Sequence, residues 1–138
     1  MPVHSGRLEF KTEGDGDVID LTAGVESVIR SSGFETGTVT VFVPGSTAAV
    51  TTMEYEPGGV HDFRETLDQL VPRHGDYHHN RLNNDTNAHA HIRAAIVGPS
   101  ETIPVSGGRL ALGTWQQIVL VDFDDRPRQR TVLISIVS

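Results

Sequence analysis

Cysteine is absent from the 138-residue chain, and lysine and tryptophan occur only once each. Without cysteine the chain can form no disulfide and offers no thiolate ligand or thiol nucleophile, so a bound metal would need His, Asp or Glu. No apolar run approaches the roughly 20 residues that cross a bilayer, which excludes a membrane-spanning helix. The stretch MPVHSGRLEF lacks the features of a secretory signal, so we expect a cytoplasmic protein without a membrane partner.

Positive charge is also scarce. The formal net charge is −7 at pH 7, which argues against a broad phosphate-binding surface and hence against a nucleic-acid partner. Apart from Lys11, the cations are ten arginines, whose planar guanidinium groups suit bidentate recognition of carboxylate or phosphate. Cationic chemistry in this chain therefore depends on arginine.

The patterning of apolar residues predicts one α+β domain over residues 1–138. Helical spacing predicts one helix from Thr22 to Gly33 and a second that ends at Pro72. β-Branched and alternating stretches predict about eight strands, at 7–12, 18–21, 38–44, 46–55, 88–98, 101–105, 109–123 and 130–138. Short turns join most of these strands, so we expect a mostly antiparallel sheet or sandwich with two helices.

Residues 72–87 form a long segment without apolar periodicity. They are rich in His, Asn, Asp and Arg, and a loop of this length is uncommon in a compact domain unless it has a functional role. The segment contains His74, His78 and His79, three of the seven histidines of the chain. We therefore expect it to contribute to a site.

The next stretch, NAHAHIRAA, carries two further histidines two positions apart. If it is a strand, its polar side chains share one face, because successive side chains alternate. That face would present Asn87, His89, His91 and Arg93. Two imidazoles about 6 to 7 Å apart at Cα can reach one metal ion. Such a pair can equally be hydrogen-bonded surface, so a metal site needs a third donor, from the preceding loop or from Glu54.

Five stretches carry a family resemblance: VTVFVPGSTAAVTTMEYEPGGVHDF, LVP, YHHN, NAHAHIRAAIVGPS and IPVSGGRLALGTWQQIVLVDFDDRPRQR. In this order they resemble the YjbQ-like family, often labelled secondary thiamine-phosphate synthase. The resemblance runs from about Val39 to the C-terminus, and the succession of A-H-I, GPS and LGTWQ makes it specific.

The resemblance implies particular site residues. The histidine of the family's Tyr-x-His-Asn pattern corresponds to His79, and the histidine of its Ala-His pattern corresponds to His91. A subset of the family has a double histidine at the second pattern, and His89 is the additional one in this chain. The glutamate of the pattern falls on Glu54, which implies metal ligands at the three histidines and a catalytic acid/base at Glu54. Many members have HTTA where this chain has GSTA, so Gly45 stands in place of a histidine.

The resemblance also implies a homotrimer that binds a small phosphorylated metabolite. The labelled reaction joins an aminopyrimidine diphosphate to a thiazole phosphate and releases pyrophosphate, as a weak side activity. A metal and arginines would neutralise that leaving group. The candidate substrate or anion contacts are Arg93, Ser46, Thr47, Gln116 and Arg128, of which Ser46 and Thr47 can equally satisfy strand-end hydrogen bonds.

The residues leave the reaction and the cofactor open. Three imidazoles favour zinc as the divalent metal, whereas Mg²⁺ bound to a diphosphate prefers oxygen ligands. A three-histidine site with Glu54 as base also suits metal-dependent hydrolysis of a small phosphorylated or carbonyl substrate. A non-catalytic trimer that binds a metal or metabolite is the third hypothesis, and a site closed by a fourth protein ligand would favour it.

Two more features have structural interpretations. The arginines between the last two strands either contact an anion or pair with neighbouring aspartates in a solvated hairpin. This cluster comprises Arg126, Arg128 and Arg130 beside Asp122, Asp124 and Asp125. The single tryptophan, Trp115, is predicted to pack in the core or in an interface.

Overall fold

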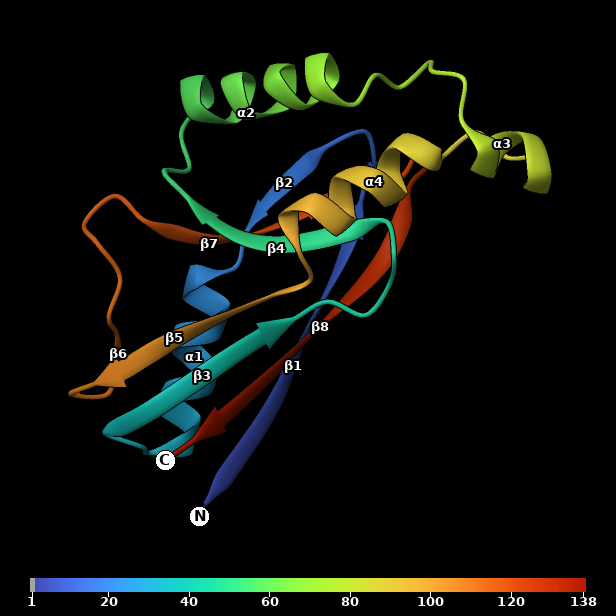
Figure 1. Cartoon of the computed structure of the whole chain (residues 1–138). Coiled ribbons are helices and arrows are strands. Elements are labelled where there is room, and N and C mark those ends of the chain that lie inside the picture. The colour runs from blue at the N-terminus through green and yellow to red at the C-terminus, as the bar shows by residue number, and fades with distance from the viewer. Residues whose placement is uncertain (1) are drawn as a thin grey trace.

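Strands from the two ends of the chain lie side by side in the larger of two antiparallel sheets (Figure 1). The computed structural model describes residues 2–138, and the larger sheet has the strand order β1-β8-β3-β5-β6. Its strands are β1 (Val3–Thr12), β8 (Arg128–Val137), β3 (Thr36–Phe42), β5 (Ser100–Ser106) and β6 (Arg109–Leu110). The smaller sheet has the order β2-β7-β4, formed by β2 (Asp17–Asp20), β7 (Gln117–Asp122) and β4 (Ala48–Met53).

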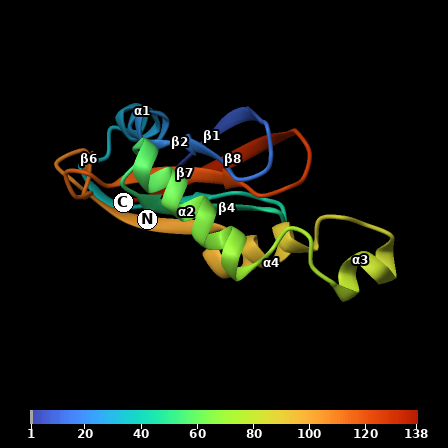
Figure 2. The same ribbon diagram turned by 90° about the horizontal axis from the view of Figure 1, so that it is seen from above.

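The smaller sheet is the middle layer of the molecule, because alternation along its strands buries both faces. Val50 and Leu120 belong to one hydrophobic cluster with the larger sheet and helix α1 (Thr22–Ser32). Val119 and Val121 belong to a second cluster with α2 (Pro57–Leu70) and α4 (Ala88–Val97). Figure 1 accordingly shows α2 and α4 on the side of this sheet away from the larger one. The short helix α3 (His78–Asn83) projects beyond the end of α4 (Figure 2).

The larger sheet is buried on one face only. Along β8, Val132, Ile134 and Ile136 point into the core, whereas the intervening residues are exposed or half-buried. Leu133 and Phe42, both on the outer face, are 38% and 39% exposed. This outer face therefore carries partly exposed apolar side chains.

The prediction of an α+β domain with mostly antiparallel strands is confirmed. The predicted strand at 88–98 is wrong, since these residues form α4, and the predicted loop at 72–87 contains α3. Residues 2–138 thus contain four helices instead of two. The predicted number of about eight strands still agrees with the structure, because the single strand predicted at 109–123 is two strands, β6 and β7. Within the described residues, none of the helices has the length and apolar character needed to span a membrane.

Candidate functional site

Helix α4 places His89 and His91 on different sides, which corrects the prediction of one shared polar face. The sequence AHAHIRAAIV contains four alanines, and alanine has the highest helix propensity. Ala90 and Ala94 are buried against the smaller sheet, where their small side chains let the helix pack closely. Residues two apart on a helix point roughly 200° apart, whereas residues four apart share a side. His89 therefore shares its side with Arg93 and not with His91.

His89 and Arg93 line a cavity of about 450 Å³, which we call the His89 pocket. Its other polar lining residues come from the β1–β2 turn, from α2 and from the segment that follows α2: Asp15, Asp68, Arg73 and His74. Asp15 has a φ of 53°, so the turn holds a non-glycine residue in the left-handed region. This turn conformation brings a carboxylate to the pocket from a distant part of the chain.

The charged groups of the His89 pocket are paired with one another. The guanidinium of Arg73 donates a hydrogen bond to the carboxylate of Asp15. Arg93 donates from Nη2 to Asp68 at 3.0 Å, and from Nε and Nη2 to the carbonyl oxygen of Val71 at 3.1 and 2.7 Å. Nη1 of Arg93 has no hydrogen-bond partner within residues 2–138. Arg93 is thus held rigidly while one of its donor groups stays free.

His89 is the least satisfied group of the pocket. Its side chain is 1% exposed, and Nδ1 has no hydrogen-bond partner among the described residues. Burial lowers the pKa of His89 from 6.5, and the positive charges of Arg93 and Arg73 lower it further. Asp125 and Asp15 act in the opposite direction without reversing the shift. The ring is therefore neutral at pH 7, with one nitrogen that donates and one that accepts a hydrogen bond.

His79 and His91 lie together on the other side of α4. Their ring centroids are 4.6 Å apart, and Nε2 of His79 is 3.8 Å from a carboxylate oxygen of Asp85. The same Nε2 is 3.1 Å from Oδ1 of Asn87. The sequence therefore identified a real pair of adjacent imidazoles, although it paired His91 with the wrong partner on α4.

A buried carboxylate fixes the orientation of His79 through Asn87. Burial acts to raise the pKa of Asp124, but hydrogen bonds from the Asp125 amide and Arg128, and the charge of Arg128, hold it at about 2. The ionised carboxylate accepts from Nδ2 of Asn87 at 3.4 Å, so the amide oxygen of Asn87 faces His79. An oxygen can only accept, so Nε2 of His79 carries the proton. Neutral His79 then has its lone pair on Nδ1.

The arginines near the C-terminus pair with the neighbouring aspartates, which is one of the two predicted arrangements. Arg126 and Arg128 are exposed, but Arg130, Asp122 and Asp124 are buried, so part of this ion network is not the solvated surface that was predicted. Arg130 forms a bidentate pair with Asp122 at 2.7 and 2.9 Å and donates to the hydroxyl of Thr47 at 2.7 Å. Arg128 donates to Asp124 at 2.8 Å. Asp122 and Asp124 are both fully buried, so their charges need these partners. Thr47 and Arg128 therefore already have protein partners, and their predicted anion contacts stay untested.

The remaining predicted residues lie away from both histidine groups. Strand β4 runs from Ala48, opposite Asp122, to Met53, opposite Gln117, a length of roughly 20 Å. Glu54 follows Met53 and is exposed, so the structure does not bring it to the histidines of the same chain. Gln116 lies at the same end, where its amide donates to Thr52 at 2.9 Å.

The loop between β3 and β4 carries the departure from the family pattern. A Cβ at Gly45 would lie 2.9 Å from Nη1 of Arg130, so a histidine at this position would require Arg130 to move. Ser46, next to it, is exposed. At the other end of the smaller sheet, Trp115 is 73% exposed, so it is not a core residue; its predicted interface role is untested.

A single zinc site made of His79, His89 and His91 does not fit this geometry, because α4 separates His89 from the other two rings. Within residues 2–138, the one group of three His, Asp or Glu residues with ligand atoms within 4.8 Å of one another is His61, Asp62 and Glu65. That group is exposed on α2.

The fold and the His89 pocket define a small α+β protein with a buried imidazole in a cavity that two arginines also line. Its sequence matches the family described as UPF0047 protein YjbQ-like over residues 6–138. The chain therefore belongs to the YjbQ-like family, which confirms the resemblance seen in its motifs. This is a family of uncharacterised function, so the activity has to be argued from the site.

Individual relatives extend this result. A UPF0047 protein of Archaeoglobus fulgidus is 41% identical over 128 residues, which cover 93% of this chain and 97% of that protein. A YbjQ-like protein of unknown function from Sulfolobus solfataricus P2 has a TM-score of 0.93 at 32% identity, over 98% of this chain and 96% of that chain. A hypothetical protein from Aeropyrum pernix K1 has a TM-score of 0.90 at 41% identity, over 97% and 98% of the two chains. The whole fold is thus shared.

Asp15, Asp68 and Arg73 of the His89 pocket were missed by the sequence reasoning. Asp15 lies in the sequence GDGD, which is typical of a turn, but only the folded chain shows which segment this turn meets. Asp68 and Arg73 belong to the end of α2 and the segment after it, and their position depends on how α2 packs on the smaller sheet.

Proposed function

We propose that the chain is an enzyme that binds a small phosphorylated metabolite in the His89 pocket. The observation that carries this proposal is the buried, unpartnered Nδ1 of His89, a residue that lines a cavity together with Arg73 and Arg93. An unsatisfied buried nitrogen costs about 1–3 kcal/mol, which a ligand group could recover by forming the missing hydrogen bond. The proposal includes a cytosolic location, where such metabolites are made.

The pocket offers phosphate both charge and hydrogen-bond donors. Nη1 of Arg93 is free, and the Arg73 side chain is 40% exposed, so its guanidinium can turn toward a ligand. Guanidinium groups match phosphate oxygens in geometry and charge. Neutral His89 can donate to a phosphate oxygen through one ring nitrogen and accept from a ligand hydroxyl or amine through the other.

The nominal reaction is the one that the family resemblance suggests. The thiazole nitrogen attacks the methylene carbon of the pyrimidine, the bond from that carbon to the diphosphate oxygen breaks, and pyrophosphate leaves with the bonding electrons. No proton transfer is needed, so the main requirement is stabilisation of negative charge on the leaving group. Arg73 and Arg93 would supply it, and His89 would orient the diphosphate.

Metal-dependent hydrolysis is the second candidate function, and the closeness of the His79 and His91 rings favours it. Two adjacent imidazoles are donors that suit zinc, and a third donor would have to come from the substrate or from another subunit, since no third ligand of residues 2–138 completes the group. A Mg²⁺ ion would instead be expected to arrive with a diphosphate substrate. Metal analysis of untagged wild-type protein and of His91→Ala tests this candidate: one zinc per chain that His91→Ala removes supports it, and metal-free wild type after zinc incubation contradicts it.

We also propose that the chain forms a homotrimer, either as the enzyme or as a non-catalytic binding protein. The exposed apolar side chains on the outer face of the larger sheet, and the exposed Trp115, support such contacts. Light scattering coupled to size-exclusion chromatography should give three times the 15.0 kDa chain mass for wild type. A wild-type mass of 15.0 kDa at micromolar concentration would exclude the trimer.

Pyrophosphate release from an aminopyrimidine diphosphate and a thiazole phosphate tests the enzyme proposal. We expect release by wild type, with a loss of at least about tenfold in kcat/KM for Arg73→Gln and His89→Gln. Lys11→Gln removes one positive charge on β1 outside the pocket and should retain wild-type activity. Equal loss in Lys11→Gln, or wild-type release no faster than the uncatalysed rate, would refute this reaction.

A further inference from the structure

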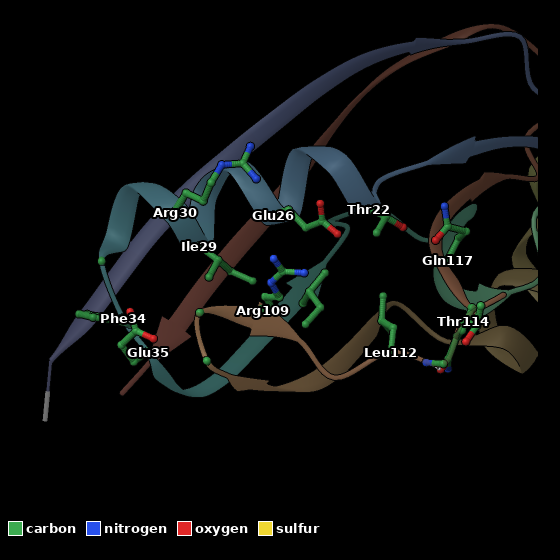
Figure 3. Close-up of a pocket in the computed structure, with 16 residues that line it drawn as sticks. Thr22, Glu26, Ile29, Arg30, Phe34, Glu35, Arg109, Leu112, Thr114 and Gln117 are labelled. Carbon is green, nitrogen blue, oxygen red and sulfur yellow. Dashed lines mark hydrogen bonds between the residues drawn. The ribbon is translucent and has the colours of Figure 1, made fainter.

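A second cavity lies at the opposite end of the smaller sheet from the His89 pocket. Strand β7 begins at Gln117, which lines this cavity. It ends at Asp122, which is paired with Asp17 at the start of β2, close to the turn that brings Asp15 to the His89 pocket. The cavity, which we call the α1–β6 cleft, has a volume of about 730 Å³ and lies between helix α1 and the hairpin of β5 and β6. Figure 3 shows its lining side chains.

The charged groups of the α1–β6 cleft lack partners, unlike those of the His89 pocket. The cleft contains two carboxylates and two guanidinium groups, from Glu26, Glu35, Arg30 and Arg109. Among residues 2–138, none of these four side chains forms a hydrogen bond of 3.5 Å or less or an ion pair of 4.0 Å or less. Glu26 on α1 and Arg109 on β6 face each other across the cleft without closing it (Figure 3). Two charges of each sign are therefore available to a ligand.

The cleft also has an apolar floor. Phe34, Leu110 and Leu112 line it, and all three are partly buried because they pack against the main hydrophobic cluster. Gln116 at the rim is fixed by accepting from the Gly113 amide at 3.1 Å and donating to Thr52 at 2.9 Å. The volume lies within the range of small-molecule sites, and the apolar floor is surrounded by a mostly polar lining.

We propose that the α1–β6 cleft binds a small zwitterion with an apolar side chain, of the α-amino-acid type. A simple anion would meet the carboxylates of Glu26 and Glu35, and a simple cation would meet Arg30 and Arg109. A zwitterion places its carboxylate at Arg109 and its ammonium group at Glu26, which face each other across the cleft, so both signs are matched. The apolar side chain covers Phe34 and Leu112. This site is separate from the His89 pocket and does not depend on the function proposed there.

A matched set of three ligands tests the proposal by backbone amide NMR. L-Leucine carries both charges, 4-methylpentanoate only the negative charge, and 3-methylbutylamine only the positive charge, with the same branched side chain. We expect saturable shifts at the amides of Gly107, Gly108 and Gly113 with L-leucine. The acid and the amine should bind at least roughly tenfold more weakly. No saturable shift with L-leucine, or equal affinity for the acid, would overturn the proposal.

Charge-neutral variants separate this cleft from general effects. Arg109→Gln and Glu26→Gln should each weaken L-leucine binding roughly tenfold. Both side chains are exposed, so the variants should fold, and the dispersion of the same spectra reports folding directly. Lys11→Gln and Glu13→Gln, which change exposed charges outside the cleft, should leave the affinity unchanged. Equal weakening in these controls would contradict the site. Added pyrophosphate should shift the His89 pocket and not the cleft, so failure of either proposal is distinguishable.

Discussion

Replacing Asp124 by asparagine perturbs the buried ion network with little change in shape. Asp124 is fully buried and accepts from Arg128 at 2.8 Å, Thr47 at 3.2 Å, Asn87 at 3.4 Å and the Asp125 amide at 2.8 Å. Asparagine keeps one oxygen but loses the charge that faces Arg128. The variant therefore removes the ionic part of the network and leaves the packing.

The magnitude follows from the burial of the pair. Breaking a buried ion pair by neutralising one partner costs about 3–5 kcal/mol. Because the Arg128 side chain is 41% exposed, its charge is partly solvated, so we expect the lower end, about 3 kcal/mol at pH 7. Urea denaturation at fixed protein concentration measures this as a lower midpoint with an unchanged slope.

The effect of Asp124→Asn should also depend on pH. The pKa of Asp124 is about 2 in the folded chain and 3.8 in the reference state, so its stabilisation is complete above pH 3.8 and lost as pH falls through the folded pKa. Protonation of Asp124 therefore lowers the free energy of unfolding of wild type by about 1 kcal/mol at pH 3 and by about 2 kcal/mol at pH 2. The variant lacks this carboxyl group and shows no such loss. The stability difference should therefore shrink by about 1 kcal/mol between pH 7 and pH 3.

Two results would refute this reasoning. A loss below about 1 kcal/mol at pH 7 would mean that the network contributes no more than a surface pair. A difference that stays constant from pH 7 to pH 3 would mean that Asp124 does not titrate with a depressed pKa. Asp62→Asn on α2, whose side chain is 82% exposed, is the matched control and should cost less than about 0.5 kcal/mol.

Three further predictions follow from the same contacts. Gly14→Ala should lower the free energy of unfolding by about 3 kcal/mol, because φ is 78° and the added Cβ would lie 2.6 Å from the Arg126 carbonyl oxygen. The control Gly107→Ala, with φ 59° and no atom within 4 Å of the added Cβ, should lower it by about 1 kcal/mol. Equal losses in urea or thermal unfolding would contradict the clash at Gly14. The pKa of His89 is lowered in the folded chain, so its contribution to stability is present above pH 6.5 and is lost as pH falls below that value. Between pH 7 and pH 5, His89→Gln should therefore lose less stability than wild type. Identical stability profiles of the two proteins would contradict the lowered pKa. Asn87→Ala removes the hydrogen-bond acceptor of Nε2 of His79. Nitrogen NMR of the imidazoles should therefore show a changed tautomer ratio at His79 and an unchanged ratio at the control residue His61. An unchanged ratio at His79 would disprove the orienting role of Asn87.

The strands of this chain could be predicted from sequence because most of them bury one face. Alternation in β8 and β-branched runs in β3 gave the strand character directly, and the antiparallel arrangement followed from short turns. The stretch 88–98 has a pattern that predicts a strand but forms a helix, because alanine fits both patterns. Its alternation of alanine with larger residues has a period of two, whereas the contacts that decide the structure are those of Ala90 and Ala94, one helical turn apart, with the smaller sheet.

The positions of the candidate site residues could be predicted only in part, because they depend on residues 88–97 being a helix. The histidines at 79 and 91 do lie together, but their partnership depends on how α3 and α4 meet, which no local pattern shows. A strand at 88–98 would place His89 beside His91, whereas helix α4 places it beside Arg93. The residues that complete the His89 pocket, Asp15 and Asp68, are 53 positions apart in sequence and meet only through tertiary packing.

The most direct test of the His89 pocket is titration calorimetry of pyrophosphate into metal-free protein. The account predicts saturable binding to wild type, weakened at least about tenfold by Arg73→Gln and by His89→Gln, and unchanged in Lys11→Gln. Absence of binding to wild type, or an equal loss of affinity in Lys11→Gln, would contradict a phosphate site at His89.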